Sequence, residues 1–461
     1  MYYIIDPNIQ IKKWQGGPAY YLHREGFKRY SLIEEDYELI KKCDGKTDIT
    51  PCFASEKLEL LGIIRPCEKD SACLLPDQIK EYPNYYVRNI DWNISDICNY
   101  RCLHCFHTAD NSMQRDSFSW EEALRFLDEM RDCGLTGVRL TGGEPTLYPR
   151  FREILQAIKD RELRLTTLIT NGSNLDEDLI SFIKSIHPKT EIRISFDGIG
   201  HHDWLRQHKG AEEQFKHAVR LCKEAVLFVY INMNINRRNR DVIFDSVKML
   251  AAMGVDGIRI IKTTEVPRWQ LNGENLTLKG TEYYDFCVDF AEKFKNSGIN
   301  VPVTIWQSLY LDPRKKTFTC LALKSSVCRF DENAPICRPM YNNKPSVLAN
   351  GDIIPCAPMA GLFASKGIRM DNVKTDGLQK ALTSGVFIDA ITHTVGEKLR
   401  VNPKCGSCSW GKVCQGGCPA VSLLFGGSLL SSDPTKCEFF SSGYYEKYCR
   451  ILEGWKNLNP I

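Results

Sequence analysis

Between residues 83 and 310, apolar runs that predict strands alternate with amphipathic runs that predict helices. The six predicted strands are Asn89–Ser95, Gly137–Thr141, Leu165–Thr170, Glu191–Phe196, Leu227–Asn234 and Gly257–Ile261. One helix opens at Ser119, with Glu122 in the spacing of a capping box. Such alternation favours parallel strands joined by right-handed crossovers, with functional side chains at the carboxyl ends of the strands. The region therefore predicts a partial (β/α)6 TIM-like barrel of the α/β class.

The segments on either side of this region differ from it in character. Residues 1–82 mix short alternating runs with a compact helix, whereas residues 311–461 are rich in Cys, Gly and Pro. Together with residues 83–310, this predicts three domains. A net charge of +3 without a long basic run gives no indication of nucleic-acid binding. No secretory signal or bilayer-spanning run is recognisable, so we expect a cytoplasmic protein without a membrane partner, and a monomer by default.

The number and grouping of the cysteines indicate which kind of chemistry this chain carries out. The sequence holds 20 cysteines, and in a reducing cytosol clustered thiols more often bind metal or carry out redox chemistry. Directly after the first predicted strand stands Cys98-Asn-Tyr-Arg-Cys102-Leu-His-Cys105. Three thiolates can hold three irons of a cubane cluster and leave the fourth iron open to a small molecule. A zinc knuckle, or buried thiols that bind nothing, are the alternatives for this spacing.

The loop after the second predicted strand favours the cluster. It reads Thr141-Gly142-Gly143-Glu144-Pro145. Glycines let the backbone approach a ligand closely and adopt φ angles that other residues avoid. Such a loop alone would be an ordinary turn, but here it follows the cysteine triplet by one βα unit.

The triplet and the glycine loop resemble the radical S-adenosylmethionine (SAM) superfamily over roughly residues 85–310. The resemblance implies that the triplet ligates a 4Fe–4S cluster that cleaves SAM reductively to a 5′-deoxyadenosyl radical. It also implies that the glycine loop hydrogen-bonds the SAM amino group, that Ser195 and Asp197 reach the ribose, and that Arg206 helps to neutralise the SAM carboxylate. An Asx turn at Asp197 and a solvated helix charge at Arg206 are the alternatives.

A second cysteine pattern occupies the C-terminal region: Cys337, Gly351 and Cys356, then Cys405-x2-Cys408-x5-Cys414-x3-Cys418, and finally Cys437. Zinc ribbons are one interpretation of this pattern. Its order and spacing resemble the SPASM domain of peptide-modifying radical SAM enzymes over about residues 328–440. The resemblance implies two further 4Fe–4S clusters, and hence three in all. The outer one, auxiliary cluster II, would have the ligands Cys405, Cys408, Cys414 and Cys437. The inner one, auxiliary cluster I, would have Cys337, Cys356, Cys418 and, as the preferred fourth ligand, Cys328. Cys320 or an open iron that binds substrate are the alternatives to Cys328.

Residues 1–82 contain a helical run around Ser31–Asp44, an Asp-Gly-Lys-Thr turn, and a Leu-Gly-Ile-Ile run that predicts a strand. These parts resemble the small winged-helix domain, similar to the PQQ-biosynthesis peptide chaperone, that recognises leader peptides. The resemblance implies that a ribosomally made precursor peptide binds here through its leader, added as a strand to a sheet edge. A structural extension without a binding role is the alternative.

We therefore expect a radical SAM maturase that installs a thioether or carbon–carbon crosslink in a precursor peptide, with flavodoxin or ferredoxin as electron donor. Epimerisation or decarboxylation of a peptide fits the same architecture. A formylglycine-generating sulfatase-maturing enzyme fits less well, because that family places an aspartate after the second cysteine of the signature, where this chain has Ala357. A metal-binding scaffold without SAM chemistry is the last alternative, and the intact triplet argues against it. The sequence identifies neither the precursor nor a catalytic acid or base.

Overall fold

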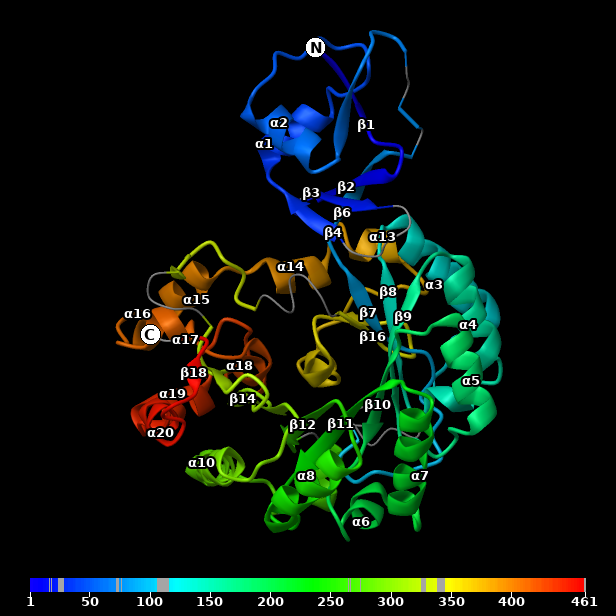
Figure 1. The fold of residues 1–461 in the computed structure, drawn as a ribbon. Helices are drawn as coiled ribbons and strands as arrows, with labels where there is room; N and C mark the ends of the chain where they lie inside the picture. Colours follow the sequence, from blue (N-terminus) through cyan, green and yellow to red (C-terminus); the bar gives the residue numbers. More distant parts are fainter. Residues whose placement is uncertain are drawn as a thin grey trace. The chain divides into compact units, whose positions relative to one another are not determined.

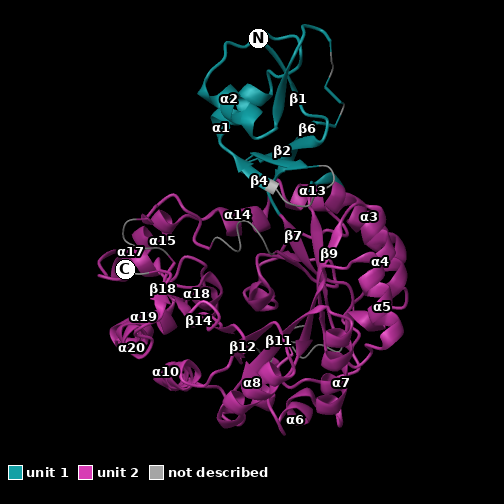
Figure 2. Ribbon diagram, in the orientation of Figure 1, with its two compact units in different colours: residues 1–87, 132–134 teal, residues 88–131, 135–461 magenta. Residues whose placement is uncertain are grey.

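The computed structural model describes residues 1–459 except 16, 18, 24–28, 72–73, 76, 106–115, 264, 266, 274, 325–328 and 338–344. The chain divides into two compact units, residues 1–87 with 132–134 and residues 88–131 with 135–461 (Figure 2). The predicted barrel and the predicted C-terminal domain both lie in the second unit, so the boundary expected near residue 310 stays a prediction.

The first unit is built from two small sheets and two helices. Its strands are β1 (Tyr2–Ile5), β2 (Ile9–Gln15), β3 (Ala19–His23), β4 (Arg29–Leu32), β5 (Ile64–Cys67) and β6 (Ile79–Tyr85). β1 pairs antiparallel with β5, and the other four form a sheet in the order β4-β3-β2-β6. The helices are α1 (Glu34–Ile40) and α2 (Phe53–Leu60). Alternate residues of β2, Ile9 and Ile11, pack with Tyr37 and Ile40 of α1 in one buried cluster.

Two of the local predictions for this unit are confirmed and one is wrong. The helix predicted around Ser31–Asp44 is α1. The predicted turn is held by the Asp44 carboxylate, which accepts hydrogen bonds at 2.8 Å from the amides of Lys46 and Thr47. The Leu-Gly-Ile-Ile run is not a strand throughout, because Gly62 turns the chain at a φ of +68° after α2 and β5 begins only at Ile64. The winged-helix assignment stays a prediction.

The second unit contains the six parallel strands that the sequence predicts. They are β7 (Asn89–Asn93), β8 (Gly137–Thr141), β9 (Arg164–Thr170), β10 (Glu191–Ser195), β11 (Phe228–Ile235) and β12 (Gly257–Lys262). Each pairs in parallel with the next along the chain. This order brings the carboxyl ends of the strands together, where the predicted site residues follow them.

Helices connect these strands and cover the outer face of the sheet (Figure 1). The helices of this part are α3 (Trp120–Asp132), α4 (Phe151–Asp160), α5 (Glu177–Ile186), α6 (His202–Arg206), α7 (Ala211–Glu224), α8 (Ile243–Ala252), α9 (Pro267–Asn272) and α10 (Thr281–Lys295). The predicted capping box is confirmed: the amide of Ser119 donates to the Glu122 carboxylate at 2.8 Å, and the amide of Glu122 donates to the Ser119 hydroxyl at 3.1 Å.

Among the described residues, the sheet extends beyond these six strands to a total of twelve strands. The additional strands are β13 (Val303–Ile305), β14 (Leu309–Asp312), β15 (Thr317–Cys320), β16 (Ser346–Val347), β17 (Ile353–Ile354) and β18 (Lys456–Asn457). β16 pairs in parallel with β7 at one end of the series, and β13 pairs in parallel with β12 at the other. C-terminal chain therefore lies beside the first barrel strand.

Short helices recur along the remaining C-terminal chain. They are α12 (Leu362–Ser365), α13 (Leu378–Ala381), α14 (Val386–Thr392), α15 (Val395–Val401), α16 (Pro403–Gly406), α17 (Gly411–Cys414), α18 (Pro419–Gly426), α19 (Pro434–Ser441) and α20 (Tyr444–Ile451). Each of these has eight residues or fewer, and such short helices leave little periodic signal in a sequence.

Candidate functional site

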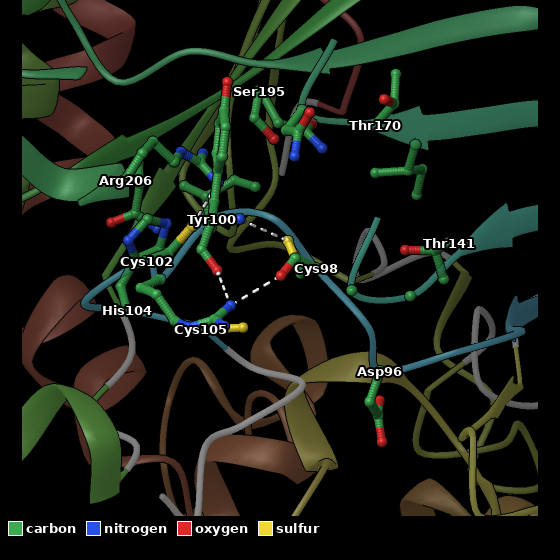
Figure 3. A pocket seen from close by; sticks show the side chains of 18 of the residues that line it. Asp96, Cys98, Tyr100, Cys102, His104, Cys105, Thr141, Thr170, Ser195 and Arg206 are labelled. Atoms are coloured by element: carbon green, nitrogen blue, oxygen red, sulfur yellow. Dashed lines mark hydrogen bonds between the residues drawn. The ribbon is translucent and has the colours of Figure 1, made fainter. Parts of the chain in front are cut away.

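The cysteine triplet lies in the loop after β7 and lines a cavity. Cys98, Cys102 and Cys105 surround a volume of about 200 Å³ together with residues from the carboxyl ends of the neighbouring strands. Figure 3 shows the three cysteines on one loop, with Arg206 next to Cys102 and Ser195 on the side of the barrel strands. The structure thus brings the triplet, the glycine loop and two of the predicted SAM contacts into one cavity.

Backbone and side-chain contacts fix the position of the cysteine loop. The amide of Arg101 donates to the carbonyl oxygen of Arg206 at 3.2 Å, and the amide of Leu103 to that of Leu205 at 3.0 Å. Leu103 and Leu205 also pack against Trp269, which is 1% exposed. The loop is therefore joined to α6 by hydrogen bonds and anchored by an apolar contact at α9.

Burial controls the protonation of the thiols. It raises the pKa of Cys98 to about 12, although the amide of Tyr100 donates to this sulfur at 3.4 Å. It raises the pKa of Cys102 to about 11, although the Arg206 guanidinium acts in the opposite direction. Both thiols are thus protonated at neutral pH until a metal centre displaces their protons.

The glycine loop after β8 lies directly against the segment that leads to Cys98. The amide of Gly143 donates to Ser95 O at 2.7 Å, and the amide of Glu144 to Ile97 O at 2.8 Å. Gly142 adopts a φ of +146°, and a Cβ there would lie 2.5 Å from Ser95 O. A Cβ at Gly143 would lie 2.3 Å from Ile97 O. Both positions therefore require glycine, because the clashing atoms belong to the backbone.

The Glu144 carboxylate does not line the cavity, and it ties the loop to the end of β9. It is fully buried and accepts hydrogen bonds from the hydroxyls of Thr146 and Thr170, both at 2.7 Å, and from the amide of Asn171 at 2.7 Å. Burial raises the pKa of Glu144, and these hydrogen bonds oppose the rise. Pro145 is buried and begins a short 3-10 turn, Pro145–Leu147. Glu144 and Pro145 therefore hold the loop in place without lining the cavity.

Asp197 and Arg206, predicted as separate SAM contacts, are paired with each other. The Arg206 Nε donates to Asp197 Oδ2 at 2.6 Å, and its Nη1 approaches Cys102 Sγ at 3.7 Å. Burial would raise the pKa of Asp197, but Arg206 and His202 hold it well below its usual range. The side chain of Arg206 is only 12% exposed, which excludes a solvated helix charge. Ser195 and Arg206 line the cavity while Asp197 does not, so its ribose contact stays a prediction.

Two further cavity residues were missed by sequence reasoning. His104 stands between the second and third cysteines and is 8% exposed, and burial lowers its pKa to about 3. Asn232 lies on the strand next to Ser195. His104 Nδ1 and Asn232 Oδ1 are buried without a hydrogen-bond partner in the described part of the chain. The position of His104 inside the triplet was the available signal, whereas Asn232 carried none.

The three described cysteines of the predicted inner set are neighbours. Burial raises the pKa of Cys356 well above its usual value, and the thiols of Cys418 and Cys337 act in the same direction. Gln307 Nε2 donates to Cys418 Sγ at 3.4 Å. Cys328, the preferred fourth ligand, lies outside the described residues. Burial also raises the pKa of Cys320, the alternative fourth ligand. The thiol that raises it further is that of Cys449, which is not a member of the inner set.

The four cysteines of the predicted outer set also lie close together. Burial raises the pKa of Cys405, and the thiols of Cys437 and Cys408 add to it. Burial raises the pKa of Cys414 to about 11, with a further contribution from Cys437. Three of the four belong to the short helices α16, α17 and α19.

Lysine side chains lie close to these thiols, and two of them are buried. Lys398 and Lys436 are 0% and 4% exposed, and Lys324 also lies near Cys414. Within the described residues, none of these three lysines forms an ion pair with a carboxylate. A buried cation is costly without a counter-charge, and a thiolate-ligated iron–sulfur cluster is anionic. The residues present therefore fit anionic clusters at these thiols.

Two features are absent from the described residues. No three or more His, Cys, Asp or Glu side chains there are arranged so as to hold a single metal ion. None of the described helices has the length and apolar character needed to cross a membrane.

Comparison with known proteins agrees with the site. Residues 92–261 match the model of the Radical SAM superfamily. The AdoMet-dependent heme synthase of Methanosarcina barkeri is 23% identical over 352 residues, 75% of this chain and 95% of that protein. The sporulation killing factor maturation protein SkfB of Bacillus subtilis is 26% identical over 176 residues, 38% of this chain. The chain spans only 35–43% of the length of several curated relatives, SkfB included.

Solved structures show the same fold over nearly the whole chain. The crystal structure of Streptococcus suis SuiB bound to S-adenosylmethionine has a TM-score of 0.63 at 16% identity, and the match covers 94% of this chain and 99% of SuiB. SuiB bound to its precursor peptide SuiA gives a TM-score of 0.62. The chain therefore contains a radical SAM domain over residues 92–261 within an α/β fold shared with these structures, and this superfamily uses SAM and a 4Fe–4S cluster.

Proposed function

We propose that this enzyme matures a ribosomally synthesised peptide by installing an intramolecular thioether or carbon–carbon crosslink. The observation that carries the proposal is the presence of two further sets of neighbouring thiols in the same unit as the SAM cavity. Similarity to the peptide maturation protein SkfB, and to the fold of SuiB, supports a peptide substrate.

The cysteine triplet would hold the cluster that binds SAM. When bound, this cluster supplies the electron that splits SAM into methionine and a 5′-deoxyadenosyl radical, which takes a hydrogen atom from the substrate. The backbone of Gly142 and Gly143 would accept hydrogen bonds from the SAM amino group. Arg206 would offer an N–H to the SAM carboxylate while Asp197 keeps its guanidinium in place. Ser195 and Asn232 would serve the polar groups of the nucleoside.

The remaining cysteine sets would hold two auxiliary clusters, which gives three clusters in all. The inner one would use Cys337, Cys356 and Cys418, with Cys328 or an open iron in the fourth position. The outer one would use the thiols of residues 405, 408, 414 and 437. The neighbouring lysines support this assignment, because protonated thiols alone would leave their charge unbalanced. A flavodoxin or ferredoxin would supply the electrons.

The first unit would bind the leader of the precursor, and β4 is the edge that suits it. Both β4 and β6 are edge strands of the four-stranded sheet. β6 contains Pro83 and pairs with β2 through a register shift, features that blunt an edge. β4 contains no proline, so its backbone is the better template for an added leader strand.

Tetrapyrrole modification is a second candidate, because the match to the heme synthase spans 95% of that relative. A crosslinking maturase explains the first unit as a leader-binding domain, whereas a tetrapyrrole enzyme gives it no role. Ala357 opens a short 3-10 turn directly after Cys356, so no carboxylate stands where sulfatase-maturing enzymes carry theirs.

Deleting residues 1–80 tests the maturase proposal. We expect the truncated enzyme to cleave SAM without substrate as the full chain does, and to lose modification of a precursor peptide encoded beside its gene. A matched control supplies the same precursor without its leader to the full-length enzyme, and modification should fail there too. If the truncated enzyme still modifies the complete precursor, the first unit does not recognise the leader.

A further inference from the structure

Lys324 connects three of the segments that carry the C-terminal cysteines. Its Nζ donates to the carbonyl oxygens of Ile336 at 2.7 Å and Gly417 at 2.5 Å. Its own amide donates to the carbonyl oxygen of Val413 at 2.9 Å. Each of these acceptors directly precedes a cysteine, two in the inner set and one in the outer set. The ammonium therefore lies where the two sets meet.

Lys398 approaches the same place from α15 and is fully buried. Its Nζ donates to Ser422 Oγ at 2.9 Å and to Leu429 O at 3.2 Å, and the Ser422 hydroxyl donates onward to Cys418 O at 3.0 Å. The stem of the lysine crosses Gly416, where a Cβ would lie 2.6 Å from its Cε. The chain thus makes room for a lysine that no solvent reaches.

The charges around these lysines do not balance without an anion. The ionisable groups with the largest effects on Lys398 are Lys324, the thiols of Cys418 and Cys405, and Asp433. The Asp433 carboxylate is 1% exposed and is occupied by backbone amides, including that of Cys418 at 2.9 Å. Among these groups there is therefore one carboxylate for two lysine side chains, and the thiols are the others that can become negative.

We propose that Lys324 and Lys398 are built-in counter-cations of the auxiliary clusters and raise their reduction potentials. The inference rests on the two auxiliary clusters of the proposed function. A reduced cluster carries one more negative charge than an oxidised one, so a buried cation stabilises the reduced form. Each cluster would then accept its one electron at a higher potential than it would beside neutral side chains. The lysines act through charge and are positioning residues, because neither ligates iron.

The test compares Lys398→Met with two controls in enzyme whose triplet is replaced by alanine, so that only auxiliary clusters give a signal. Lys404→Met removes an exposed lysine next to Cys405, where solvent screens the charge. Ser422→Ala removes a hydrogen-bond partner of Lys398 but leaves the charge of Lys398 in place. Iron and acid-labile sulfide are counted first, and midpoint potentials are then measured by redox titration followed by electron paramagnetic resonance.

We expect Lys398→Met to keep both auxiliary clusters and to shift one or both midpoints to more negative potential. The shift should reach at least tenfold in the reduction equilibrium, which is about 59 mV for one electron. The two controls should shift less than half as far. If Lys398→Met keeps its clusters and shifts no further than Lys404→Met, the counter-cation role is wrong.

Two other outcomes are also decisive. If Lys398→Met fails to assemble its clusters, Lys398→Arg should restore them because it keeps the positive charge, and failure of both variants overturns the proposal. If the triplet variant with all its lysines contains no auxiliary iron, the three-cluster assignment is wrong and this inference falls with it. Iron content thus separates failure of the proposed function from failure of the inference.

Discussion

The variant Glu144→Gln tests whether the Glu144 carboxylate holds the glycine loop in place. The carboxylate has Oε1 facing the amide of Thr146 and the hydroxyls of Thr146 and Thr170, and Oε2 facing the amide of Asn171. A glutamine has only one carbonyl oxygen, so it can serve one side. If it serves the Oε1 side, its amide nitrogen meets the N–H of Asn171, and two donors face each other in a buried site.

The variant therefore loses at least one hydrogen bond to a buried charge, a loss of about 1.5–3 kcal/mol. Because Glu144 follows the two glycines that would contact SAM, we expect this loss to appear as weaker SAM binding. At about 1.4 kcal/mol per tenfold, the dissociation constant should rise roughly 10- to 150-fold. Isothermal titration calorimetry of the anaerobically reconstituted enzyme with SAM measures it.

Glu153→Gln is the matched control, because Glu153 is exposed and makes only a 3.6 Å ion pair with Arg150. We expect its effect to stay below about 0.5 kcal/mol. If Glu144→Gln binds SAM within threefold of the unaltered enzyme, the carboxylate does not hold the loop in its binding geometry.

Three further changes have defined outcomes. Gly143→Ala places a Cβ 2.3 Å from Ile97 O and should abolish iron binding at the triplet, whereas Gly298→Ala, with open space around its Cβ, should retain all iron in the same assay. Trp269→Ala should cost about 3–5 kcal/mol of local stability and speed amide exchange in the cysteine loop, which exchange mass spectrometry detects. Burial lowers the pKa of His187 below 6.5, so the unfolded chain binds more protons in acid and stability falls as pH drops below that value. Urea unfolding of His187→Gln should show a weaker fall, and an equal fall would contradict this reasoning.

The barrel was predictable because its signals are local and repeated. Each of the six strands has five or more residues and includes at least two apolar side chains, and the capping box at Ser119 marks the start of α3. The predicted strand ends differ from the observed ones by at most two residues. At Gly62 the apolar pattern is misleading, because the apolar run continues across a turn that only a left-handed φ reveals.

The pairing of Asp197 with Arg206 was not predictable from the pattern. Both residues were assigned to SAM separately, yet α6 folds back so that the guanidinium reaches the carboxylate at 2.6 Å. His202 on the same short helix adds a contact to Asp197 at 3.2 Å. A helix of five residues gives no periodicity from which to place its side chains.

The lysines near the C-terminal thiols carried no sequence signal at all. Lys324 and Lys398 are single charged residues in a region without periodicity, and such residues are ordinarily exposed. Only the fold reveals that one bridges three cysteine segments and that the other is fully buried. By contrast, the resemblance of the cysteine pattern to the SPASM domain predicted both thiol sets from the sequence.

The most direct test of the account is the mass of a precursor peptide encoded beside the gene. The peptide is incubated anaerobically with reconstituted enzyme, SAM and reductant, and a parallel reaction contains an iron-bound tetrapyrrole. A crosslinking maturase should remove two hydrogen atoms per modified site from the peptide, located by fragmentation, and should leave the tetrapyrrole unchanged. An unchanged peptide together with a modified tetrapyrrole would contradict it.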